Sequence, residues 1–135
     1  MSRLGRLAAS ALLILASSAG SQPASDLWSD ARPLTLQLSS FKFAPSDIML
    51  EHGVPYALHF VNSSSGGHDF AAKAFFAGAQ IRAEDRAKIR GGRVEIGGGE
   101  SVDIRLIAPS PGTFKVRCTH FMHSMFGMTG RIVVQ

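Results

Sequence analysis

Short segments in which apolar and polar residues alternate recur along most of the chain. Alternation with a period of two places the apolar side chains on one face of a β-strand. Turn-forming sequences rich in glycine and proline separate the segments. The pattern therefore predicts strands packed into a β-sandwich. The expected strands are residues 34–38, 48–51, 56–61, 94–96, 102–106, 114–118 and 131–134.

Two regions depart from this pattern. Phe41 and Phe43 continue the apolar parity of the first strand after a shift, and Pro45 then breaks the run. Residues 71–89 are rich in alanine, include Phe75 and Phe76, and are interrupted by Gly78. We interpret this second region as a crossover with one or two helical turns that pack on the sandwich.

The first 24 residues have the composition of a secretory signal peptide. Arg3 and Arg6 precede an apolar run at residues 7–16, and small residues follow at 17–20. The run is too short to span a membrane. We expect cleavage between about residues 19 and 24, export to the periplasm, a leader at 25–33, one domain at 34–135 and no membrane span in the mature protein.

Once the signal peptide is removed, the net charge of the chain is small and excludes few classes of partner. The sequence has 14 basic and 10 acidic residues, and loss of Arg3 and Arg6 leaves a net charge of +2. Nucleic-acid binding has little support because the basic stretch at 82–93 contains no aromatic residues. That stretch is interpreted as a solvated surface or, alternatively, as a docking patch for an acidic partner. Its basic residues are Arg82, Arg86, Lys88, Arg90 and Arg93.

The segment 118–130 carries most of the candidate chemistry. It contains the only cysteine, Cys118, together with His123 five residues later and Met128 five residues after that. Thiolate, imidazole and thioether form the soft donor set that selects copper. A trigonal copper site needs a second imidazole, for which His68 in a glycine-rich loop is the best candidate. A lone cysteine in an oxidising compartment is reactive, paired between chains or held by a metal.

At this point the sequence resembles the blue copper proteins, or cupredoxins. The resemblance rests on an early histidine after a strand ending in asparagine, followed far downstream by Cys118, His123, Met128 and a final strand that begins near Gly130. The spacing within the loop is most similar to that of rusticyanin-type members. The resemblance implies an all-β, Greek-key sandwich with one type 1 copper per chain, bound by His68, Cys118, His123 and Met128.

Several assignments within this site have alternatives. His120 could replace His123, but it lies only two residues after Cys118, where its reach is poor. Met122 and Met125 compete with Met128 for the axial position. Asp69 either orients the site or is simply solvated. Cys118 and His123 could also form a nucleophile and base, although no orienting group or oxyanion hole is visible. We expect no enzymatic activity.

The resemblance also implies a function and a partner surface. In cupredoxins the loop histidine lies at the surface within a ring of apolar groups, and electrons leave through it. Here that ring would contain the apolar residues Phe121, Met122, Met125 and Phe126. The first hypothesis is therefore a periplasmic one-electron carrier that docks a redox partner near His123. The alternative is a periplasmic copper-handling or copper-tolerance protein, because His120, Met122 and Met125 could bind a second copper.

Overall fold

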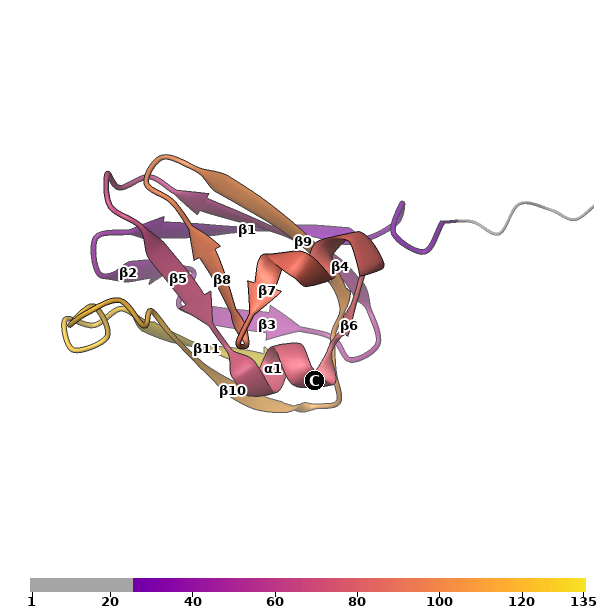
Figure 1. The fold of residues 1–135 in the computed structure, drawn as a ribbon. Helices are drawn as coiled ribbons and strands as arrows, with labels where there is room; N and C mark the ends of the chain where they lie inside the picture. The colour runs from indigo at the N-terminus through magenta and orange to yellow at the C-terminus, as the bar shows by residue number, and fades with distance from the viewer. Residues whose placement is uncertain (1–25) are drawn as a thin grey trace, which may run out of the picture.

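The computed structural model of the chain describes residues 26–135, which form two β-sheets packed face to face (Figure 1). The signal peptide expected at 1–24 lies outside the described residues. One sheet has the order β2 (Lys42–Ala44), β1 (Arg32–Ser39), β4 (Pro55–Asn62), β9 (Ser101–Ile107) and β6 (Gln80–Ile81). The other has the order β3 (Asp47–Leu50), β11 (Thr129–Val134), β10 (Gly112–Arg117), β5 (His68–Ala71), β8 (Arg93–Ile96) and β7 (Ile89–Arg90).

The alternating pattern predicted β1, β3, β4, β8, β9, β10 and β11 because one face of each is buried, but it did not predict β2, β5, β6 and β7. Along β4 the buried residues are Tyr56, Leu58, Phe60 and Asn62, with partly exposed neighbours between them. β1 starts at Arg32, two residues before the expected strand, because Arg32 pairs in register with Tyr56 of β4. The prediction of a two-sheet sandwich is confirmed.

Strand pairing fixes where the chemistry-bearing loop begins and ends. β10 and β11 pair antiparallel, with Arg117 opposite Thr129, so the last strand lies beside the strand that leads to Cys118, as predicted. β11 also pairs in parallel with β3. Because β11 has a neighbour on each side, the end of the loop is held inside the six-stranded sheet rather than at its edge.

The crossover after β5 is helical, as the alanine-rich sequence predicted, but it contains two short helices where one or two helical turns were expected. These are α1 (Lys73–Gly78) and the 3₁₀ helix η1 (Ala83–Lys88), separated by β6. Asp85 anchors η1 because its buried carboxylate accepts hydrogen bonds from Lys88 Nζ (2.6 Å) and from the backbone N–H of Arg105 (2.8 Å). Burial would raise the pKa of Asp85, but these hydrogen bonds outweigh that effect and the pKa is lowered.

A row of aromatic rings joins the two sheets in the core. Phe70 of β5 contacts Phe43 of β2 and Phe60 of β4, with ring centroids 5.5 and 4.9 Å apart. Phe70 also faces Phe76 of α1 at 6.2 Å, so the crossover packs on the same core. Aromatic pairs at these distances add to the stability that burial provides.

Phe41 departs from the sequence expectation. The pairing of Ser39 with Lys42 leaves Ser40 and Phe41 as a two-residue turn between β1 and β2. Phe41 therefore leaves the apolar parity that it was expected to continue with Phe43, and its side chain is exposed. Its φ of +59° is uncommon for a bulky residue.

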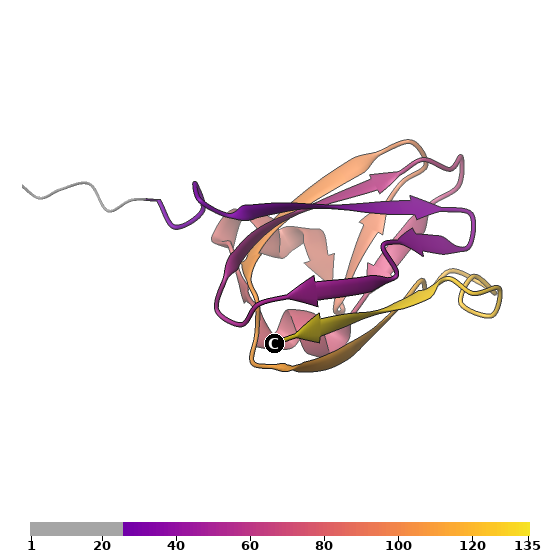
Figure 2. The same ribbon diagram turned by 180° about the vertical axis from the view of Figure 1, so that it is seen from behind.

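The loops that matter for function meet at one end of the sandwich. The β1–β2 turn, the loop between β4 and β5, and the loop between β10 and β11 lie at that end, whereas α1 and η1 lie toward the other (Figure 1). The reverse view in Figure 2 shows the β1–β2 turn beside the β10–β11 loop. Among residues 26–135 no helix is long and apolar enough to cross a membrane.

Candidate metal centre

Three predicted site residues converge at this end of the sandwich. His68 is the first residue of β5, Cys118 directly follows β10, and His123 lies in the loop before β11. Cys118 Sγ is 3.4 Å from His123 Nδ1 and 3.9 Å from His68 Nδ1, and the two Nδ1 atoms are 3.1 Å apart. All three donor atoms therefore point at one small volume.

These separations suit donors that share one metal ion. Metal–nitrogen bonds in proteins are about 2 Å long and metal–thiolate bonds about 2.3 Å, so donors on one ion lie about 3 to 4 Å apart. Two imidazoles with one thiolate are the equatorial donors of blue-copper sites. The donor set fits one type 1 copper.

Met128 is the only one of the three loop methionines that is enclosed by protein. Its residue exposure is 0 %, against 37 % for Met122 and 79 % for Met125. Its backbone carbonyl accepts a hydrogen bond from the N–H of Cys118 (3.1 Å), which places the two residues side by side. The structure therefore favours Met128 over the other two as a thioether donor from inside the protein.

The loop between Cys118 and Met128 is wound into consecutive turns. The carbonyl of His123 accepts hydrogen bonds from Phe126 N–H (3.2 Å) and Met128 N–H (3.1 Å). Gly127 has a φ of +96°, which a residue with a Cβ rarely adopts. A Cβ on Gly130 would lie 2.5 Å from the carbonyl oxygen of Ser46. These glycines let the loop close tightly and let β11 approach the segment before β3.

Asn62 holds the loop that delivers His68. Its buried side-chain amide donates to the carbonyls of Gly66 (2.8 Å), Ile96 (3.0 Å) and Gly97 (3.1 Å). Its side-chain oxygen accepts hydrogen bonds from Ser64 N–H (3.0 Å) and Ser64 Oγ (2.6 Å). A single side chain therefore joins β4, the end of β8 and the loop that leads into β5.

Asp69 holds Cys118 and the residue that follows it. Its backbone N–H donates to Cys118 Sγ at 3.5 Å. Its carboxylate, which is 1 % exposed as a residue, accepts hydrogen bonds from both the N–H (2.7 Å) and the hydroxyl of Thr119. Of the two roles considered for Asp69, the structure therefore supports orientation of the site and not ordinary solvation.

In the protein without metal, burial shifts the pKa of two of the donors, Cys118 and His68. It raises the pKa of the Cys118 thiol, and hydrogen bonds from the N–H groups of Asp69 and His120 only partly oppose this. It lowers the pKa of His68, and repulsion from His123 and His120 adds to the effect. A neutral imidazole offers its lone pair to a metal, but the thiol must lose a proton first. A raised thiol pKa is the opposite of what a nucleophilic cysteine needs.

His120 does not join these donors. Its Nε2 lies 2.7 Å from Glu95 Oε1, and its ring stacks on His123 with centroids 5.4 Å apart. His120, Glu95 and Asp69 make a second group of donors within 4.8 Å of one another. Because Arg93 Nε lies 3.9 Å from Asp69, a cation there would be repelled.

The comparisons with known proteins agree with this geometry. The model of a family described as copper binding proteins, plastocyanin/azurin family, matches residues 33–135. The chain belongs to this family. A comparison with curated protein sequences found no match for this cupredoxin.

Solved structures show the same fold at low sequence identity. Dithionite-reduced auracyanin from Roseiflexus castenholzii superposes with a TM-score of 0.59 at 19% identity, over 78% of this chain and 98% of that one. Auracyanin A from Chloroflexus aurantiacus, a "blue" copper protein, gives 0.53 at 19% identity over 76% and 99%. A multicopper oxidase from Pseudomonas thermotolerans gives 0.61 at 18% identity, over 79% of this chain but only 30% of the oxidase.

An exposed apolar surface surrounds the loop of this cupredoxin. Phe121, Met122, Met125 and Phe126 are exposed, as the sequence predicted. Phe41 joins them from the β1–β2 turn: its ring meets that of His123 edge-on at 5.2 Å and that of Phe126 at 5.1 Å. We refer to these five residues as the apolar loop surface.

Sequence reasoning missed four residues that support the site. The sequence did not indicate that Asn62 bonds to loop backbone, that Thr119 bonds to Asp69 or that Glu95 bonds to His120. Phe41 looked like a core residue of a strand. The only available signals were the asparagine at the end of β4 and the polar residues next to His68 and Cys118.

Asn62→Ala tests the hydrogen-bonded support of His68. It removes the hydrogen bonds to the carbonyls of Gly66, Ile96 and Gly97 and leaves Ser64 without its acceptor, and a buried group that loses its partner costs about 1–3 kcal/mol. We expect the free energy of unfolding, measured by chemical denaturation, to fall by about 3 kcal/mol, with weaker copper binding. Ser63→Ala on the same loop is the control and should change stability by less than about 0.5 kcal/mol. A loss for Asn62→Ala as small as that of the control would refute the role of Asn62.

Proposed function

We propose that this cupredoxin is a one-electron carrier whose copper is bound by His68, Cys118, His123 and Met128. The observation that carries the proposal is the convergence of three donor atoms within 3.9 Å of one another, with His68 and Cys118 buried and His123 partly exposed. Bound copper would supply exchange of one electron between Cu(I) and Cu(II). The family match supports copper as the metal.

The protein's own residues would keep the donors in place during that exchange. β10 and β11 hold Cys118 and Met128, Asn62 holds the loop before His68, and Asp69 holds Cys118. Donors held by hydrogen bonds from residues of both sheets should move little between the geometries that Cu(I) and Cu(II) prefer. Small rearrangement on electron transfer is what a carrier requires.

His123 would be the route for electrons to a partner protein. It is partly exposed, and Phe41 and Phe126 of the apolar loop surface lie against or near it. An exposed apolar surface marks a contact site, and a small one suits the weak, brief contacts of redox proteins. We therefore propose that a redox partner docks there.

The expected location and loop type belong to the same proposal. The signal-like sequence at 1–24 supports export to the periplasm. The spacing Cys118, His123, Met128 supports a rusticyanin-type loop. We further propose that the protein is not an enzyme, since the likeness to multicopper oxidases covers only about a third of their chains.

Copper analysis and a visible spectrum of the purified mature protein test this proposal. We expect one copper per chain and an intense thiolate-to-copper band. Cys118→Ser should abolish the band and weaken copper binding more than about 100-fold, since loss of supporting residues alone costs about 10–100-fold.

Met128→Leu should keep the band and raise the reduction potential, because the weak axial donor tunes the site. Met125→Leu is the matched control, because Met125 is exposed and should leave the potential unchanged. A colourless wild-type protein, or a potential that responds to Met125 and not to Met128, would contradict the assignment.

A second candidate function is copper handling, which the exposure of two loop methionines favours. Met122 and Met125 present thioethers to solvent, and His120 lies on the same loop. Thioethers are ligands for Cu(I), so the loop could accept a second copper ion.

Cu(I) titration separates the two candidates. Copper handling predicts a second Cu(I) per chain that is lost in Met122→Leu/Met125→Leu, together with copper sensitivity of cells that lack the protein. Electron carriage predicts one copper in both wild type and double variant. A second equivalent that survives the double substitution would exclude these methionines as its ligands.

A further inference from the structure

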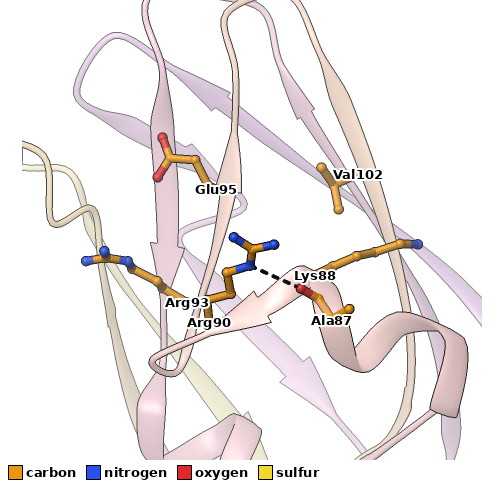
Figure 3. A pocket seen from close by; sticks show the side chains of 6 residues that line it. All are labelled: Ala87, Lys88, Arg90, Arg93, Glu95 and Val102. Atoms are coloured by element: carbon orange, nitrogen blue, oxygen red, sulfur yellow. Dashed lines mark hydrogen bonds between the residues drawn. The ribbon is translucent and has the colours of Figure 1, made fainter.

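The basic stretch at 82–93 is partly neutralised by acidic side chains in the folded protein. Arg82 pairs with Glu84 (2.9 Å) and Lys88 pairs with Asp85 (2.6 Å). Figure 3 shows a pocket beside η1 and β8 at which the side chains of Lys88, Arg90 and Arg93 extend in different directions. Of this stretch, only Arg93 belongs to the cationic pocket described next.

A different set of cations, distant in sequence, lines a pocket on the six-stranded sheet. The pocket has a volume of about 370 Å³, and its charged lining residues are Lys73, Arg93, Lys115 and Arg117. The other lining residues are Ala71, Gly91, Gly92 and Thr119, so the lining contains no acidic residue, and the carboxylate of Asp69 already accepts a hydrogen bond from the hydroxyl of Thr119. We call this the cationic pocket.

Three of the four cations have no protein partner. Within residues 26–135, the side chains of Lys73, Lys115 and Arg117 make no ion pair or hydrogen bond with protein, whereas Arg93 Nε lies 3.9 Å from the Asp69 carboxylate. Like charges gathered in one hollow repel one another and raise the local concentration of anions. The pocket therefore carries an excess of positive charge, which a bound anion would balance.

The backbone holds these cations together. Lys115 and Arg117 are two residues apart on β10 and so project from the same face of the strand. A Cβ on Gly92 would lie 2.6 Å from Lys73 Cα, so only glycine lets the β7–β8 turn pack against the start of α1. Arg93 Nη1 donates to Thr119 Oγ1 at 3.3 Å. The fold therefore sets the backbone positions from which these four side chains reach the pocket.

We propose that the cationic pocket is a binding site for a small multivalent oxyanion, with inorganic phosphate as the representative ligand. Arginine guanidinium groups and lysine ammonium groups are the usual protein partners of phosphate oxygens. The pocket is concave, which suits a compact anion better than the flat surface of a macromolecule. Thr119 directly follows Cys118, so a bound anion would lie next to the loop that carries the metal donors.

Nuclear magnetic resonance titration with phosphate tests the proposal without depending on the proposed function. The ¹⁵N-labelled protein is titrated at constant ionic strength in both its Cu(I)-loaded and metal-free, reduced forms. We expect saturable shifts of the amide signals of Gly91, Gly92 and Thr119 in both forms. Failure of copper loading would affect only the first form, so the two proposals fail separately.

Single charge removals identify the site. Lys115→Gln and Arg117→Gln should each weaken phosphate binding at least about tenfold, the effect of one lost charge-assisted hydrogen bond. Lys42→Gln is the matched control, because Lys42 is an exposed lysine on β2 of the other sheet. Absence of saturable binding, equal weakening by all three variants, or binding of polyglutamate but not phosphate would each overturn the proposal.

Discussion

The hydrogen bond from the N–H of Cys118 to the carbonyl of Met128 is the contact on which the rest of the site depends. It continues the ladder between β10 and β11 by one step, so two residues ten positions apart in sequence lie side by side. The intervening loop must then turn back within a short distance, and His123 occupies the turn that faces Cys118. Sheet pairing, not the affinity of the donors for a metal, brings the donors together.

His68 reaches the same point by a separate route. β5 pairs with both β10 and β8, and Ala71 lies opposite Arg117, so the start of β5 runs beside the chain that continues from β10 through Cys118. Asn62 and Asp69 then fix the backbone before and after His68. Each support is a buried polar group whose hydrogen bonds are made within the protein, which is the condition under which burial of such groups is tolerated. The supports should keep the donors in position even without metal.

The sequence predicted the seven strands that have one buried and one solvated face. It did not predict β5, which is buried on both faces, or the short strands β2, β6 and β7. It predicted the four candidate donors because their chemistry and spacing are distinctive. It failed where the outcome depended on tertiary contacts, as with Phe41, which leaves the core because β1 and β2 are joined by a two-residue turn. The cationic pocket was also invisible, since Lys73, Arg93 and Lys115 become neighbours only through sheet order. In the structure, burial distinguishes Met128 from Met122 and Met125 as the candidate axial donor. In the sequence, only the motif around Met128 distinguished it.

The surface features divide the molecule by function. The apolar loop surface lies at the end of the sandwich where His123 is partly exposed, and the cationic pocket lies on the six-stranded sheet next to Thr119.

The central claim is that His68, Cys118 and His123 bind one copper ion, and X-ray absorption at the copper edge of the loaded protein tests this claim most directly. We predict one sulfur ligand at the short distance of a metal–thiolate bond and two imidazole nitrogens at about 2.0 Å. A copper shell made only of nitrogen and oxygen, with no short sulfur, would contradict the account.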